Sequence, residues 1–305
     1  MSFPRIVVVD YHKGNLSSVV KGLTRSGAHA FSSDDPSTIA SADGIVIPGV
    51  GSYYDAAAFL GESGLGDAIL SSCKAGKPLL GICLGLQLLF ECGDEGVLPS
   101  NETLVGASLP QCRDNVCESS KDQSQSLDDC DSKIDKRFIS AKVEHSHKLG
   151  LESSQLDSVT TNFVNSSLYQ TSLEKDFSVG TVFSANSKNF VRGLGFIAGA
   201  CERLESRRLK VPHVGWDQLH LTELGERNAL LRGVTEGANV YFTHSYIAPE
   251  SCDEKFVLAK THYVKSFPCV VASENIYGVQ FHPEKSSSQG LLILENFVSI
   301  VRGAC

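Results

Sequence analysis

Apolar residues in the first ninety positions alternate between short continuous runs and a helical spacing. Continuous runs predict buried strands at 5–10, 28–31, 43–47 and 78–82. Stretches between them repeat their apolar residues every three or four positions and predict helices at 16–27, 55–60 and 65–75. Strands that alternate with helices at this interval predict a parallel sheet with helices on both faces.

The pattern returns to this form after residue 193. Strands are expected at 239–242, 255–264, 269–272 and 276–281. A terminal helix follows, and its apolar side is formed by Leu291, Leu292, Leu294, Phe297, Val298 and Val301. The two ends of the chain therefore predict a single α/β domain with core segments 5–96 and 193–301.

The middle of the chain, 97–192, has a different composition. It holds 18 serines but only 3 of the 27 glycines. Its stretch 111–132 is polar, carries charges of both signs and is almost without aromatic residues, which is typical of a disordered or loosely held loop. Its second half regains apolar residues such as Phe163 and Phe183, which favour strands or a small subdomain. We interpret 97–192 as an insertion into the domain.

Composition narrows the class of protein. The 305 residues are 42% hydrophobic and 20% charged, with a formal charge of -8. This balance provides neither the clustered cations that nucleic-acid binding needs nor a polybasic patch for a membrane surface. No run of residues is long and apolar enough for a membrane span. The ten cysteines lack paired regular spacing, which favours free thiols and a cytoplasmic location.

One segment has the pattern of a nucleophile on a sharp turn. In Gly81-Ile82-Cys83-Leu84-Gly85, a buried strand meets a helix at a cysteine that has a glycine two positions away on either side. A strained strand-to-helix turn needs such small neighbours, and it presents its central side chain for reaction. The helix N-terminus favours the thiolate, and the N–H of Leu84 points toward the oxyanion that an attack would form.

A thiol nucleophile needs a base that is itself held in place. The segment Gln280-Phe281-His282-Pro283-Glu284-Lys285 ends a buried strand with a histidine and a proline. Glu284, two residues after His282, can return to hold the imidazole in the required tautomer. We therefore predict that Cys83, His282 and Glu284 form a catalytic group, rather than a buried cysteine and an unrelated surface histidine.

With these two motifs, further segments carry a resemblance to a known family: Asp10-Tyr11, Gly14-Asn15, Pro48-Gly49-Val50-Gly51, the stretch 211–216, His244-Ser245-Tyr246 and Lys285-Ser286. The chain resembles the class I (triad) glutamine amidotransferases, and among them the glutaminase subunits of imidazole glycerol phosphate synthase. The resemblance covers about 5–96 and 193–301. It implies a flavodoxin-like α/β fold with a central, mostly parallel sheet flanked by helices.

The resemblance also implies an activity and a set of roles. The activity is hydrolysis of glutamine to glutamate and ammonia for histidine biosynthesis, by a triad without a cofactor. The implied oxyanion donors come from Val50, Gly51 and Leu84. The implied substrate-binding residues are Gly49, Gln87, His244, Ser245 and Tyr246. The implied contacts to a separate cyclase subunit, which would receive the ammonia in a heterodimer, are Asn15, Trp216 and Lys285.

Two departures from the family pattern stand out. His12 replaces a usual glycine, so we expect the loop after the first strand to differ locally. The insertion 97–192 is absent from the typical subunit. Because nothing after residue 301 can be the cyclase, we expect that enzyme to be a separate chain, unless this chain is a fragment of a fused enzyme.

Other interpretations stay open on the sequence alone. The chain could serve a different amidotransferase, cleave γ-glutamyl or peptide bonds, or be a non-catalytic interaction protein. Trp216 could be a core residue, and 244–246 could be a polar strand end. Potential zinc ligands occur in the insertion, at Cys112, Cys117, Cys130, His145 and His147, but their spacing matches no zinc pattern, so we predict no metal.

Overall fold

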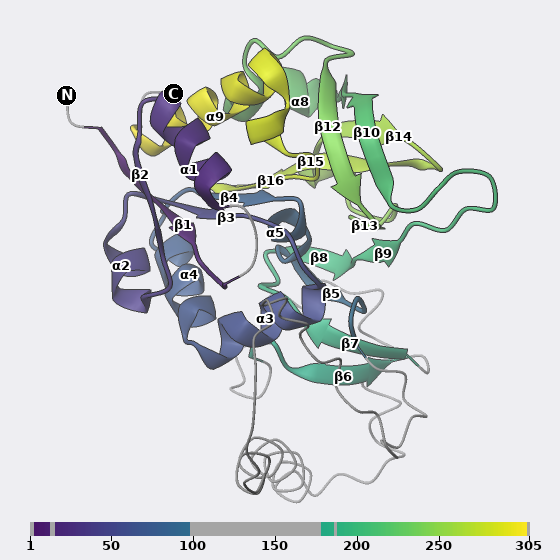
Figure 1. Cartoon of the computed structure of the whole chain (residues 1–305), viewed down its shortest axis with the longest axis horizontal. Helices are drawn as coiled ribbons and strands as arrows, with labels where there is room; N and C mark the ends of the chain where they lie inside the picture. The colour runs from purple at the N-terminus through teal and green to yellow at the C-terminus, as the bar shows by residue number, and fades with distance from the viewer. Residues whose placement is uncertain (1–2, 13–15, 98–177, 186–187, 304–305) are drawn as a thin grey trace, which may run out of the picture. The chain divides into compact units, whose positions relative to one another are not determined.

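An eight-stranded mixed sheet organises the chain (Figure 1). The computed structural model describes residues 3–12, 16–97, 178–185 and 188–303. Up to residue 97 the elements are β1 (Arg5–Val9), α1 (Leu16–Arg25), β2 (His29–Ser33), α2 (Pro36–Ser41), β3 (Gly44–Ile47), α3 (Tyr53–Glu62), α4 (Leu65–Lys74), β4 (Leu79–Ile82), α5 (Leu84–Gln87) and β5 (Phe90–Gly93).

The second part of the chain supplies the remaining strands and the C-terminal helix. Its elements are β6 (Val182–Ala185), β7 (Lys188–Arg192), β8 (Ile197–Ala200), β9 (Glu202–Arg203), β10 (His213–Gln218), β11 (His220–Leu221), α8 (Glu223–Arg227), η2 (Ala229–Leu231), β12 (Asn239–His244), β13 (Tyr246–Ile247), η3 (Glu254–Phe256), β14 (Val257–His262), β15 (Ser266–Ser273), β16 (Ile276–Val279), η4 (Pro283–Lys285) and α9 (Ser287–Val301).

The strand order of the large sheet is β11-β14-β15-β16-β4-β3-β1-β2. Strands β2, β1, β3, β4 and β16 run parallel to one another. Strands β15, β14 and β11 extend this block in antiparallel pairs. The predicted α/β class with a mostly parallel central sheet is confirmed, and the antiparallel extension makes the sheet mixed.

Both faces of the parallel block are buried, which explains the continuous apolar runs of its strands. Along β1, Val7 and Val9 pack into the cluster that contains buried residues of α2, α3 and α4. Ile6 and Val8 point to the other face, into the cluster that contains buried residues of α1 and α9. Figure 1 shows these two groups of helices on opposite sides of the sheet.

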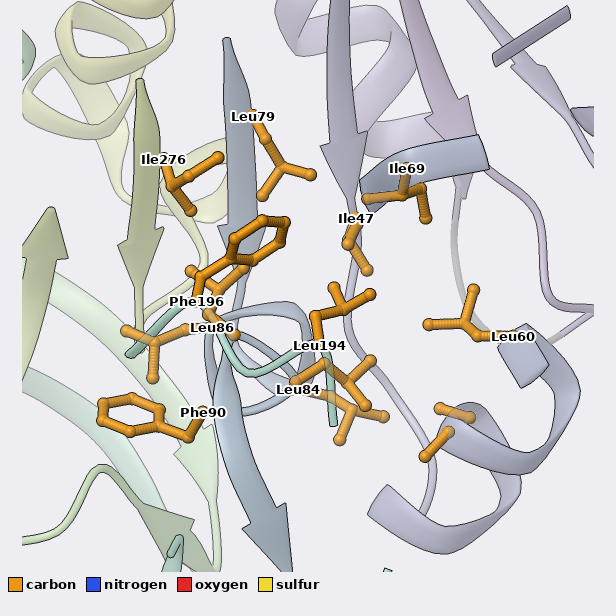
Figure 2. Close-up of a cluster of buried hydrophobic side chains, with 14 of the residues drawn as sticks. Ile47, Leu60, Ile69, Leu79, Leu84, Leu86, Phe90, Leu194, Phe196 and Ile276 are labelled. Carbon is orange, nitrogen blue, oxygen red and sulfur yellow. The ribbon is translucent and has the colours of Figure 1, made fainter. Parts of the chain in front are cut away.

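The first cluster continues around the turn that carries Cys83. Figure 2 shows side chains from β3, β4, β16, α3, α4 and the turn of α5 meeting in one apolar group. Within it, Leu84 and Leu86 of α5 are almost fully buried, and so is Phe90 of β5. This packing holds the residues on either side of Cys83 against the first apolar cluster.

The predicted strands and long helices are present, with small changes at their ends. The strand expected at 255–264 is shorter, because its first residues form the 3-10 turn η3 before β14 begins at Val257. The sequence pattern missed α2, which buries only Ile39 and therefore lacks an apolar periodicity. Its beginning is instead set by Asp35, whose carboxylate accepts from the N–H groups of Ser37 and Thr38.

Most of the expected insertion, including all five potential zinc ligands, lies outside the described residues. Its last part forms β6 and β7, which belong to a four-stranded sheet in the order β6-β7-β5-β8. Strand β7 pairs with β5, so that Arg192 lies opposite Cys92. The end of 97–192 is therefore joined by strand pairing to the predicted core. No helix among the described residues is long and apolar enough to cross a membrane.

The turn at Cys83 allows no extra atoms between the elements it joins. A Cβ on Gly85 would lie 2.0 Å from the carbonyl oxygen of Ile47 in β3, and a Cβ on Gly81 would lie 2.4 Å from the carbonyl oxygen of Gly85. Backbone atoms of a central strand cannot move aside without breaking their own hydrogen bonds. These glycines therefore set the distance between α5 and the sheet.

We expect Gly85→Ala to lower the free energy of unfolding by about 2–3 kcal/mol or more, because its methyl group overlaps the Ile47 carbonyl. The matched control is Gly22→Ala in α1, where the nearest atom is the end of the Leu294 side chain. The control should stay within about 1 kcal/mol of the unsubstituted chain. Urea unfolding measures both, and equal stabilities would contradict the close packing described for the turn.

Candidate active site

The predicted site residues come from the carboxyl ends of neighbouring parallel strands. Cys83 follows β4, the Gly49–Gly51 loop follows β3, and Tyr11 follows β1. His282 follows β16 after a short extension. Because these strands are parallel and adjacent, their carboxyl ends share one edge of the sheet. This is the edge at which open α/β sheets place their ligands.

Cys83 occupies the strained turn that its sequence context predicts. Its backbone has φ 54° and ψ -105°, a conformation that L-residues rarely adopt, between β4 and the single turn of α5. Its N–H donates to the carbonyl of Val279 in β16 at 2.7 Å. The side chain is buried, contrary to our expectation of an exposed thiol, and its Sγ lies 3.7 Å from the carbonyl oxygen of Thr243. Because α5 has only four residues, any helix-dipole effect on the thiol is small.

His282 and Glu284 form a buried pair beside Cys83. The imidazole Nδ1 lies 3.0 Å from Glu284 Oε1, and each side chain is only 4% exposed. A carboxylate can only accept, so Nδ1 carries the proton and Nε2 is the nitrogen left for the thiol. Nε2 makes no other hydrogen bond within the described residues. The carboxylate therefore fixes the orientation of the ring, with Nε2 on the side of the thiol.

The electrostatic environment favours the charged form of His282. Burial lowers its pKa, but hydrogen bonding to Cys83 and Glu284 outweighs burial and raises the pKa to about 9. Nearby His244 behaves in the opposite way, since burial and the neighbouring His213 lower its pKa to about 3. The site therefore contains one histidine that is charged at neutral pH and one that is neutral.

The backbone around the base is locked by Ser286. Its hydroxyl donates to the carbonyl of His282 at 2.6 Å and accepts from the N–H of Tyr241 at 2.9 Å. The N–H of His282 donates to the carbonyl of Tyr241 at 2.9 Å. Ser286 is fully buried. These bonds join η4 to β12 and fix the position of the His282 backbone relative to that strand.

Three of the expected substrate-binding residues meet next to the thiol. Gln87, nearly buried, donates from Nε2 to the carbonyl of Tyr246 at 2.8 Å. His244 Nδ1 lies 2.9 Å from the same carbonyl oxygen. Ser245 is held from the other side, because its carbonyl accepts from the N–H of Leu204 at 2.8 Å. The segment 244–246, which begins at the end of β12, is thus held in place by hydrogen bonds, and its part in glutamine binding stays a prediction.

The loop expected to supply an oxyanion donor lies against the turn of Cys83. A Cβ on Gly49 would lie 2.2 Å from the backbone nitrogen of Leu84, so only glycine allows this approach. The N–H of Val50, however, donates to the hydroxyl of Tyr11 at 3.2 Å, and that hydroxyl donates to the carbonyl of Pro48 at 2.7 Å. In this arrangement the Val50 amide is engaged by Tyr11. Gly51, beside it, has φ 119°, a conformation that favours glycine.

The residues expected to contact a partner are on the surface where they are described. Trp216 is 53% exposed and touches only the edge of the site region, with its ring 5.9 Å from that of Tyr241. Core packing of this tryptophan is therefore wrong. Lys285 is exposed and lines a cleft of about 540 Å³ between α1 and the start of α9. Asn15 lies outside the described residues.

The backbone conformation of His12 is one that favours glycine. Its backbone has φ 58°, in the left-handed region that favours glycine. The histidine is held there by contacts of its side chain, with its Nε2 3.4 Å from an oxygen of Asp34 and its ring 5.2 Å from that of Phe59. His12 itself therefore has a backbone conformation typical of glycine although it carries a side chain.

Several residues of the site had no role in the sequence analysis. Gln280, fully buried, donates from Nε2 toward Cys83 Sγ at 3.7 Å, and its Oε1 accepts from Gln87. Tyr11 and Ser286 hold backbone groups of the site, as described above. A buried polar residue beside a catalytic motif, as in Gln280-Phe281-His282, is the signal that could have identified Gln280. In the described part of the chain, no group of three or more His, Cys, Asp or Glu is arranged to hold a metal ion.

Comparison with known proteins agrees with this geometry. The family model described as "Glutamine amidotransferase class-I" matches residues 7–173 and 193–301. Among solved structures, the PurLQS complex structure from Thermotoga maritima contains a chain that matches with a TM-score of 0.53 at 14% identity, covering 98% of this chain and 99% of that one. Such a low identity supports the fold alone.

Curated relatives are more similar in sequence. The imidazole glycerol phosphate synthase subunit HisH of Gloeobacter violaceus is 32% identical over 97% of this chain and 89% of its own length. The protein of the same name from Moorella thermoacetica is 32% identical over 98% of this chain and 96% of its own length. Matches of this extent, together with the family model, show that the chain belongs to the class I glutamine amidotransferases.

Proposed function

We propose that this chain is the glutaminase subunit of imidazole glycerol phosphate synthase, which supplies ammonia to a separate cyclase subunit in histidine biosynthesis. The observation that carries the proposal is the buried His282–Glu284 pair beside Cys83 at the carboxyl edge of the parallel strands. The names of the curated relatives support the choice of this member of the family. A non-catalytic protein has no need to keep this pair buried and charged. The six described cysteines are all free thiols, which is consistent with the cytoplasm as its location.

The proposed reaction follows from the positions of three side chains. The Cys83 sulfur attacks the side-chain amide carbon of glutamine, so that a C–S bond forms and the carbonyl becomes an oxyanion. His282, protonated at Nε2, gives its proton to the leaving nitrogen, and ammonia departs as a thioester forms. His282 then accepts a proton from water as the water oxygen attacks the thioester carbon. The C–S bond breaks, so that glutamate is released and Cys83 returns as the thiolate beside protonated His282. Glu284 keeps the proton of Nδ1 in place throughout.

The oxyanion needs donors that face the turn of Cys83. We assign one donor to the N–H of Leu84 and the second to the Val50–Gly51 segment. Since the Val50 N–H is bonded to the Tyr11 hydroxyl, this second donor has to leave Tyr11 before it can serve. Each such donor stabilises the transition state by about 3 kcal/mol. The proposal therefore includes a switchable oxyanion hole and low hydrolysis in the chain alone.

The exposed face of β10 is the surface that we assign to the cyclase. Val214 and Trp216, which alternate with inward-facing residues, are 56% and 53% exposed on this strand. Large apolar side chains on a surface mark sites of protein association. Lys285, beside the catalytic pair, is assigned to the same interface together with Asn15. Ammonia released at Cys83 would then leave toward the partner rather than into bulk water.

Cys83→Ala is expected to lower ammonia release from glutamine by at least about 10⁴-fold, because the attacking sulfur is lost. Cys252→Ala is the matched control, since Cys252 is also a buried free thiol but lies outside the site. The control should keep its activity within about twofold. Enzymatic detection of ammonia and glutamate measures both variants. Substantial release by Cys83→Ala would rule out the proposed nucleophile.

Titration of His282 tests the role of Glu284. The charged imidazolium is stabilised by the Glu284 carboxylate, so the ring should lose its proton at about pH 9 in the unsubstituted chain. Glu284→Gln removes the negative charge, and the midpoint should move to lower pH. NMR of the His282 ring signals against pH measures the midpoint. Glu295→Gln, an exposed position on α9, serves as the control and should leave it in place. An unshifted midpoint in Glu284→Gln would disprove the coupling.

Trp216→Ala tests the assigned interface. A large exposed tryptophan that becomes buried on association commonly contributes about 2 kcal/mol, so the Kd for the cyclase subunit should rise about 30-fold. Leu224→Ala on α8, where the side chain is 48% exposed, should leave the Kd unchanged. Calorimetric titration of the full chain with the cyclase provides the values. Equal affinities for the two variants would place the interface elsewhere.

A further inference from the structure

Two histidines, His213 and His244, are joined at the start of the segment 244–246. In the antiparallel ladder of β10 and β12, His213 is directly opposite His244. His213 is buried, with its ring stacked on Tyr263 at 4.0 Å and on Phe242 at 4.8 Å between ring centroids. Its Nδ1 lies 3.2 Å from His244 Nε2. The two aromatic contacts prevent the His213 ring from turning, so its nitrogens have fixed directions.

His213, His244 and the Tyr246 carbonyl form a series of hydrogen bonds. The carbonyl at its end determines which ring nitrogens carry protons. The carbonyl oxygen of Tyr246 can only accept, so His244 Nδ1 must carry a proton toward it. His244 is neutral, because burial and His213 lower its pKa to about 3, and its Nε2 is therefore an unprotonated acceptor. His213 must then donate from Nδ1 to His244 Nε2. No other assignment of protons to these two neutral rings gives two hydrogen bonds.

Among the described residues, the far side of His213 makes no hydrogen bond that competes with this assignment. Its Nε2 is unprotonated when Nδ1 carries the proton, and the nearest carboxylate oxygen, that of Asp217, is 3.6 Å away. This separation is too long for a hydrogen bond. Burial lowers the pKa of His213, and the charge of Asp217 opposes this shift without cancelling it. His213 thus acts as a neutral donor, and Asp217 is not part of the hydrogen-bond series from His213 through His244 to the Tyr246 carbonyl.

The hydrogen-bond series ends at the Tyr246 carbonyl, which also binds Gln87, a residue expected to bind glutamine. The Tyr246 carbonyl accepts two hydrogen bonds, one from His244 Nδ1 and one from Gln87 Nε2 at 2.8 Å. Gln87 also donates to Gln280, which in turn faces the Cys83 sulfur. The direction of the Tyr246 carbonyl therefore decides the direction of the Gln87 amide. A change in the tautomer of His244 would place a lone pair against this carbonyl and push it away.

We propose that His213 is a positioning residue for glutamine binding: by donating to His244 it selects the tautomer that holds the Tyr246 carbonyl against Gln87. The inference deepens the proposed function and rests on it. His213 touches neither the thiol nor the catalytic pair. Its loss should weaken the binding of glutamine much more than it slows the chemical step.

The test compares two variants of the full chain in glutamine hydrolysis. His213→Phe keeps the aromatic stack with Tyr263 and Phe242 but has no donor, so we expect KM for glutamine to rise about tenfold while kcat stays within about threefold. His213→Asn restores an N–H donor near the position of Nδ1 and should bring KM back to within about threefold of the original value. Asp217→Asn is the matched control and should change neither constant.

The outcomes separate this inference from the proposed function. An unchanged KM in His213→Phe, or a KM in His213→Asn as high as in His213→Phe, would overturn the role of His213. Absence of glutamine hydrolysis by the unsubstituted chain in the presence of the cyclase subunit would instead overturn the proposed function. If His213→Phe does not fold, His213→Leu and His213→Asn, which are similar in size, give the same comparison.

A measurement on the unsubstituted chain needs no variant. NMR couplings between the ring nitrogens and ring protons distinguish the two neutral tautomers of a histidine. We expect both His213 and His244 to carry their protons on Nδ1 at neutral pH. A proton on Nε2 of His244 would show that His244 does not donate to the Tyr246 carbonyl, and it would refute the inference directly.

Discussion

The left-handed backbone of Cys83 is the constraint on which the site depends. This conformation costs roughly 1–3 kcal/mol and persists only where surrounding structure enforces it. Here β3 and β16 flank β4, the Cys83 N–H is bonded to Val279, and Gly85 lies against the Ile47 carbonyl with no space for a side chain. The sheet therefore holds Cys83 in a bent turn from which its sulfur faces β12 and His282.

The polar groups around this turn are arranged so that only one histidine carries charge. Glu284 stabilises the His282 imidazolium, whereas burial keeps His244 and His213 neutral. Neutral imidazoles can each donate and accept, so they link backbone groups of β12 and β10 without adding a second cation beside the base.

Sequence patterns were most informative where chemistry is local in the chain. The glycines around Cys83 and the close spacing of His282 and Glu284 already determine a turn and a hydrogen-bonded pair, and both are present. The burial of the thiol was not predictable, because it depends on Thr243 and Gln280 from distant strands. Nor was the engagement of the Val50 amide, because Tyr11 reaches it from the end of another strand.

By itself, then, the sequence determined the strand–helix alternation, the local turn at Cys83 and the family, and it predicted the group of Cys83, His282 and Glu284, since these are carried by periodicity and by short motifs. Tertiary structure alone decided the antiparallel extension of the sheet, the pairing of β7 with β5 and the proton arrangement of His213 and His244. The reason is physical: a histidine's tautomer is selected by the partners that face both ring nitrogens, and strand register brings those partners together from residues far apart in the chain.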